Sequence, residues 1–68
     1  PNSVMVTEGD LAKDYKEVAR IYTVGGPKDK EEAFSLMRRR LSEFGADAVI
    51  KVRKKKNMNY EGIVVLFD

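Results

Sequence analysis

The segment that most constrains the fold of this chain is the apolar run Ile-Val-Val-Leu-Phe at residues 63–67. Successive side chains of a β-strand point to opposite faces of the sheet, so a strand with this sequence is apolar on both faces. The chain offers one clear amphipathic helix, and a helix about 10 Å wide covers roughly two strands on one face. The second face must therefore be covered by something else: another copy of the chain, a ligand, or the N-terminal segment.

The helix is predicted at residues 29–44. A Gly-Gly-Pro sequence at residues 25–27 interrupts the preceding structure, and Asp29 with Glu32 has the spacing of a capping box. Gly45 suits the left-handed position that ends many helices. Apolar side chains recur at helical spacing and fall within about 100° of the helix circumference. These side chains are Ala33, Phe34, Met37, Leu41 and Phe44.

Strands are predicted on both sides of this helix. The segments concerned are rich in β-branched and aromatic residues, and Asn57-Met58-Asn59 supplies turn residues between the last two. The predicted strands are residues 3–7, 16–24, 47–55 and 60–67, with a charged loop at residues 8–14. This order, (β)β-α-β-β, predicts one small α+β domain over residues 1–68, an antiparallel sheet with one helix on one face.

One set of side chains in the last strand must face away from the helix. The two sets are Ile63, Val65 and Phe67, or Val64 and Leu66, and alternation alone does not say which one meets the helix. A chain of 68 residues without cysteine has a small core and no disulfide to support it. We therefore expect a homo-oligomer, with Ile63, Val65 and Phe67 as candidates for its interface. The alternative is a strand that tolerates a few exposed apolar side chains.

Several kinds of chemistry lack their usual residues. The chain has no Cys and no His, which removes the thiolate nucleophile, the histidine base and the commonest transition-metal ligands. Glu8, Asp10 and Asp14 could offer oxygen ligands to a hard cation, but their spacing is not that of a calcium loop. We expect neither an enzyme, nor a cofactor, nor a metal site. No apolar run approaches the roughly 20 residues of a membrane helix.

Charge is unevenly distributed along the chain. Residues 1–34 carry five basic and seven acidic side chains, whereas residues 35–68 carry eight basic and four acidic ones. A basic run lies at the predicted hairpin tip, where it could neutralise phosphates, with a tyrosine near enough in sequence to stack on a base. This candidate site for an anion or a single-stranded nucleic acid comprises Arg53, Lys54, Lys55, Lys56 and Tyr60. The alternative is a charged tip that keeps a small sheet soluble and discourages edge pairing.

Residues 45–52, with the sequence Gly-Ala-Asp-Ala-Val-Ile-Lys-Val, resemble a segment typical of the YbjQ-like family, small bacterial proteins often labelled as heavy-metal-binding. In that family a helix ends in a similar Leu-Gly-Ala-Asp-Ala-Val-Val sequence and continues into a strand. The stretch from Glu8-Gly9 through residues 15–18 to Val24-Gly25-Gly26 is similar to the family's first strand and its glycine turn. The segment between Gly26 and the helix is shorter here than in typical members.

The resemblance implies a dodecin-like β-α-β-β topology and an oligomer, since pentamers are known for YbjQ relatives. It brings no cofactor, because the chain has no Cys or His for a heavy metal and no Trp such as dodecins use to hold flavin. We therefore expect a non-catalytic, homo-oligomeric binding or assembly module; the alternative is an anion or single-stranded nucleic-acid binder. A chain that starts at Pro1 is expected to be trimmed or part of a longer protein. Cytoplasm is the default compartment, and an extracytoplasmic one stays open.

Overall fold

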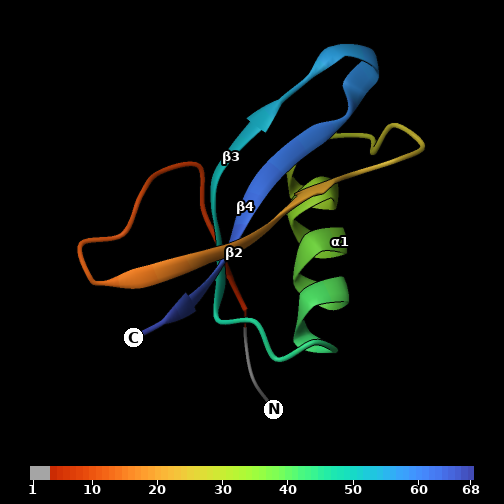
Figure 1. Cartoon of the computed structure of the whole chain (residues 1–68). Coiled ribbons are helices and arrows are strands. Elements are labelled where there is room, and N and C mark those ends of the chain that lie inside the picture. Colours follow the sequence, from red (N-terminus) through yellow and green to blue (C-terminus); the bar gives the residue numbers. More distant parts are fainter. Residues whose placement is uncertain (1–3) are drawn as a thin grey trace.

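The protein is a mixed β-sheet with one α-helix on one face (Figure 1). The structure is a computed structural model and describes residues 4–68. Its elements are β1 (Met5–Val6), β2 (Tyr15–Tyr22), α1 (Lys30–Ser42), β3 (Ala48–Lys54), a 3-10 turn (Lys56–Met58) and β4 (Tyr60–Phe67). The strands lie side by side in the order β1-β3-β4-β2. The predicted α+β class and order of elements are confirmed, except that Ser3 of the first predicted strand lies outside the described residues.

The sheet is mixed, and the prediction of a wholly antiparallel sheet was wrong for β1. β2 and β3 both run antiparallel to β4, but β1 pairs in parallel with β3, with Met5 beside Ala48 and Val6 beside Val49. β1 and β2 therefore run in the same direction at opposite edges of the sheet. Residues 7–14, which we call the crossing segment, have to cross a face of the sheet, because two parallel strands cannot be joined by a tight hairpin.

This crossing covers the face of the sheet that is turned away from α1, which we call the far face (Figure 1). Ala48, Ile50 and Val65 are fully buried there, and Leu11 and Tyr15 from the crossing segment and the start of β2 pack against them. The sequence allowed three ways to cover the second face: another copy of the chain, a ligand or the N-terminal segment. The structure shows the N-terminal segment on this face.

Backbone hydrogen bonds hold the crossing segment in place. The carbonyl groups of Thr7 and Gly9 accept from the amides of Val52 at 3.1 Å and Lys51 at 2.9 Å. These amides are free to do so because the pairing of β3 with β4 is interrupted between Ile50 and Arg53. Lys51 has a positive φ of 54°, a conformation that bulged strands use to redirect their backbone groups.

The face towards α1, which we call the helix face, carries the larger part of the core. The sheet residues Val49, Val52 and Val64 lie buried under the helix. The helix contributes Ala33, Met37 and Leu41, all buried. In β4 it is therefore Val64, not Ile63 or Val65, that meets the helix, which answers the question that alternation left open.

The ends of α1 are formed largely as predicted. Asp29 is the N-cap and its carboxylate accepts from the amide of Glu32 at 2.9 Å, while the Glu32 carboxylate accepts from the amide of Lys28 at 3.2 Å. After the helix, Gly45 has a φ of 73° and the amide of Ala46 bonds to the carbonyl of Leu41, which closes the last turn.

The predicted helix was too long at its C-terminal end. The helix stops at Ser42, because the chain must turn through Gly45 to start β3. Phe44 was therefore wrongly placed in the buried stripe: its side chain is exposed and lies beside the guanidinium of Arg40, 4.8 Å from the ring centre.

Candidate interaction surfaces

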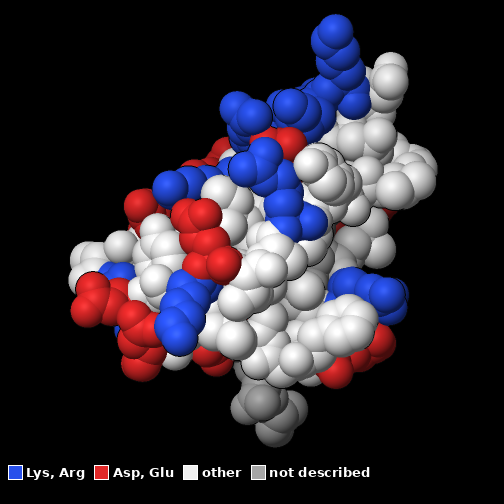
Figure 2. Space-filling view, viewed as in Figure 1, with Lys and Arg blue, Asp and Glu red and all other residues white. Residues whose placement is uncertain are grey.

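Basic side chains gather around the tip of the β3–β4 hairpin, as Figure 2 shows at the top of the molecule. Arg53, Lys54, Lys55 and Lys56 line a shallow depression of about 460 Å³ at the tip. Arg20 from β2 and Lys51 from β3 join Arg53 around a smaller hollow of about 220 Å³. The four basic residues predicted for an anion site are thus brought together, and two further cations extend the surface across the sheet.

One carboxylate already occupies part of this surface. Glu61, whose side chain is only 9% exposed, accepts from Arg53 Nε at 2.7 Å and lies 3.7 Å from Lys55 Nζ. The hydrogen bond from Arg53 lowers the pKa of Glu61 despite its burial, and the charges of Arg53, Lys55 and Arg20 act in the same direction. Lys54 and Lys56 are therefore the side chains of the tip that are best placed to meet an external anion.

Tyr60 does not belong to this surface, and its predicted role in base stacking is wrong. It lies in β4 on the helix face, where its side chain is 8% exposed and packs in the core. Its amide donates to the hydroxyl of Thr23 at 2.9 Å, and its carbonyl accepts from the amide of Thr23 at 2.8 Å. Sequence proximity to the basic run was misleading because successive strand residues point to opposite faces.

Two acidic side chains of the crossing segment, those of Glu8 and Asp10, pair with neighbours of this chain. Glu8 forms a 2.8 Å ion pair with Lys30, which raises the pKa of that lysine. Asp10 accepts from the Tyr15 hydroxyl at 2.6 Å and lies 3.9 Å from Lys51 Nζ. Within residues 4–68, no three acidic side chains are grouped as a metal ion would require.

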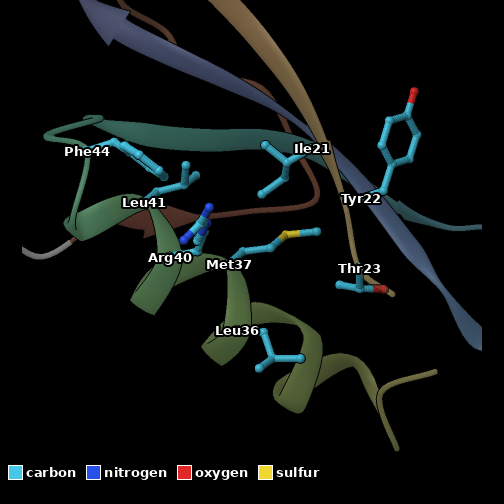
Figure 3. A pocket seen from close by; sticks show the side chains of 8 residues that line it. All are labelled: Ile21, Tyr22, Thr23, Leu36, Met37, Arg40, Leu41 and Phe44. Atoms are coloured by element: carbon cyan, nitrogen blue, oxygen red, sulfur yellow. The ribbon is translucent and has the colours of Figure 1, made fainter. Parts of the chain in front are cut away.

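A groove lies on the helix face, between α1 and β2 (Figure 3). It holds about 400 Å³, and in it Ile21 points towards Met37 and Leu41 while Tyr22 points away to the other side of β2. Its lining residues are Ile21, Tyr22, Thr23, Leu36, Met37, Arg40, Leu41 and Phe44. The groove exists because one helix cannot cover a sheet of four strands: α1 lies over the β1–β3 side and leaves β2 open.

Strand β2 forms an open edge beside this groove. It pairs with β4 on one side only, and six of its eight residues are exposed. The pairing with β4 has a β-bulge: Glu17 lies beside Val65 and Ala19 beside Val64, so Val18 is an extra residue. Sequence reasoning predicted this strand but not its edge position. The available signal was its mixed composition, since a central strand with Lys16, Glu17 and Arg20 is unusual.

The predicted interface residues of β4 lie on the far face, where the crossing segment covers them unequally. Val65 has no exposed surface, while Ile63 and Phe67 are half-buried. Lys13 of the crossing segment places its ammonium 3.9 Å from the centre of the Phe67 ring. Within a single copy, Val65 has no surface left with which to contact a second chain.

Comparisons place no known protein beside this chain: no family model, no curated protein and no solved structure matches it. The resemblance to YbjQ-like proteins remains a prediction from the residues that carry it. In the part of the chain that the structure describes, no helix is long and apolar enough to cross a membrane.

Proposed function

We propose that this protein is a non-catalytic assembly module that works by associating with copies of itself, as its resemblance to YbjQ-like proteins suggests. The observation that supports the proposal is the open edge of β2, which lies directly beside the apolar groove under α1. An unpaired strand edge presents a row of amides and carbonyls to a partner, and a neighbouring apolar groove adds surface to bury.

The location of this edge differs from the interface expected from the sequence. The far face is largely covered by the chain's own N-terminal segment, so the apolar run of β4 does not require a second copy. On the helix face, Leu36, Phe44 and Leu66 remain exposed, and β2 bounds that region. Association through β2 would shelter apolar surface that the single chain leaves in water.

Light scattering of the purified protein across micromolar to millimolar concentrations tests this proposal. We expect the mass to rise from one chain to a closed oligomer as concentration increases. A variant with Arg20→Pro should remain a monomer, because proline at this exposed residue removes an amide that points to the open edge of β2. Val24→Pro, at an exposed residue just beyond β2, is the matched control and should associate normally. A wild-type mass of one chain throughout would contradict the proposal.

A second function, binding of a polyanion such as a single-stranded nucleic acid, is favoured by the cations at the hairpin tip. Lys54 and Lys56 are exposed at the tip, and no ion pair within residues 4–68 engages either side chain. Such contacts release counterions, so binding should weaken by orders of magnitude between about 50 and 200 mM salt if several phosphates are engaged.

Fluorescence anisotropy with a labelled single strand measures this second function. The Lys54→Glu/Lys56→Glu variant should lose binding, whereas Lys13→Glu/Arg39→Glu, with the same change in net charge away from the tip, should retain most of it. Equal loss in both variants would indicate a general charge effect instead of a site at the hairpin. No binding by the wild type at low salt would exclude this function.

A further inference from the structure

We infer that β2 pairs antiparallel with β2 of a second copy across a two-fold axis, in the register that sets Glu17 opposite the partner's Arg20. This inference rests on the proposed self-association and specifies its geometry. It follows from three properties of β2: the direction of its backbone groups, the position of its bulge, and the faces on which its side chains lie.

Hydrogen bonds at the two ends of β2 fix the direction of its backbone groups. At one end the Asp14 carbonyl accepts from the Asp68 amide, and at the other the Thr23 amide donates to the Tyr60 carbonyl, so both residues face β4. Residues of an antiparallel strand alternate between facing one neighbour and facing the other. Counting inward from each end, the residues that direct their amides and carbonyls to the open edge are Tyr15, Glu17, Arg20 and Tyr22.

The bulge at Val18 makes the spacing of these outward residues irregular. Glu17 and Arg20 are three positions apart, whereas an ordinary strand presents an outward residue at every second position. An ordinary edge strand would therefore fall out of register halfway along β2. The β2 strand of a second copy has the same three-residue spacing. When it runs antiparallel, its Val18 and Ala19 lie opposite Ala19 and Val18 of the first copy, so the outward residues on both sides of the bulge stay in register.

Side-chain faces favour the same register. Through the pairing with β4, Glu17 lies beside Val65 and Arg20 beside Ile63, so both point to the far face, while Ala19 and Ile21 point to the helix face. With Glu17 opposite the partner's Arg20, the paired side chains at positions 15 and 22, 16 and 21, and 17 and 20 lie on the same face. A shift of one residue sets Glu17 opposite the partner's Ala19 or Ile21, on the wrong face.

The charges are complementary in this register. The two-fold axis produces the pair of Glu17 and Arg20 twice, with opposite charges directly across the strands, and sets Tyr15 opposite the partner's Tyr22 at both ends. The pairing would also bring the two α1–β2 grooves together on one face of the joined sheet, with Lys16 of each copy opposite the partner's Ile21.

Charge reversal tests the register. Glu17→Arg and Arg20→Glu should each raise the dimer dissociation constant by about tenfold or more, because two attractive pairs become repulsive. The double variant Glu17→Arg/Arg20→Glu should restore the wild-type constant to within about threefold, since the pairs re-form with exchanged signs. Glu31→Arg and Arg39→Glu on α1 make the same charge changes away from β2 and should leave association unchanged.

A cross-linking experiment gives a second readout that does not depend on charge. The chain has no cysteine, so Val18→Cys and Ala19→Cys each introduce a single thiol. A mixture of the two proteins should oxidise to a mixed disulfide dimer, because the register sets these positions opposite each other, whereas Val24→Cys with Ala19→Cys should not. Circular dichroism confirms that every variant is folded before it is compared.

The outcomes separate this inference from the proposed function. A wild-type protein that stays monomeric at all concentrations would overturn both. A dimer that ignores the reversals at residues 17 and 20 and does not form the mixed disulfide would overturn the register and leave self-association intact. A pentamer would also overturn the register, because a closed five-fold ring cannot be built from a two-fold contact of β2 alone.

Discussion

The two faces of the sheet are closed by different means. The far face is covered by a segment without regular structure, which is held by backbone bonds to β3 and by the hydrogen bond between Tyr15 and Asp10. The helix face is covered by α1, which packs through side chains over β3 and leaves β2 uncovered. A segment without regular structure can cross the far face from one edge of the sheet to the other, whereas a rigid helix covers only part of the helix face.

This difference teaches where a partner can act. The far face is largely closed by the chain's own crossing segment, although its apolar run made it the first candidate for a partner from the sequence. The helix face remains incomplete beside the edge strand β2. Substitutions on each face, ordered here from the largest expected effect to the smallest, test whether the two faces differ in this way.

The largest effect is expected from shortening a buried side chain on either face. Ile50→Ala on the far face and Met37→Ala on the helix face should each cost about 2–5 kcal/mol of unfolding free energy, because both side chains are fully buried. Urea unfolding measures the change. If either variant fails to fold, Ile50→Val should still cost about 0.5–1.5 kcal/mol. If Ile50→Ala left the unfolding free energy unchanged, the crossing segment would not bury the far face as the structure indicates.

A smaller loss is expected where the helix face has no room for a side chain. A methyl group on Gly62 would lie 2.5 Å from Val49 Cγ1, so Gly62→Ala should cost about 1–3 kcal/mol through overpacking. Gly9→Ala on the crossing segment is the matched control, since its methyl group would lie 3.8 Å from its nearest neighbour, the Thr7 hydroxyl. The double variant Gly62→Ala/Val49→Ala should lose less unfolding free energy than the sum of the two single variants, because the smaller side chain at residue 49 makes room for the added methyl group. Equal effects at both glycines would contradict this packing.

Much of the fold was predictable because its signals are local. The capping pair Asp29 and Glu32, Gly45 after the helix, and the β-branched hairpin strands each specify structure from neighbouring residues, and all are confirmed. The parallel pairing of β1 was not predictable in this way. It depends on how residues 7–14 cross the sheet, and that depends on the distant bulge at Lys51.

Among the candidate surfaces, too, the one that depends on neighbouring residues was predictable and those that depend on distant parts of the chain were not. The basic side chains of residues 53–56 lie together because they are contiguous in sequence. Tyr60 lies in the core instead, because the alternation of β4 points its side chain to the helix face. The edge of β2 depends on the strand order, and the groove depends on where α1 lies across the sheet. Neither property is encoded in a motif, so composition could indicate only that β2 is unlike a central strand.

Closure of the far face should depend on pH through Tyr15. Its hydrogen bond to Asp10 raises the pKa of Tyr15 from 10.0 to about 12, so the stability that it adds is complete between neutral pH and about pH 10 and is lost as pH rises through about 12. Tyr15→Phe should lower the melting temperature at neutral pH, and its difference from the wild type should vanish at the alkaline end. Tyr22→Phe, whose side chain is exposed, is the control. A pH-independent difference would mean that the hydrogen bond is not responsible.

The smallest effect is expected in the groove. Leu36 is 40% exposed there, so in dilute solution Leu36→Ala should change the unfolding free energy by no more than about 0.5 kcal/mol, as at most surface positions. If pairing of β2 joins the grooves of two copies, the wild type should melt at a higher temperature than the variant as protein concentration rises, because association stabilises the folded state. Thermal unfolding across a concentration series measures both. A large loss of unfolding free energy for Leu36→Ala in dilute solution would show that α1 already closes the helix face. If the protein is a dimer and the difference in melting temperature does not change with concentration, the groove lies outside the dimer interface.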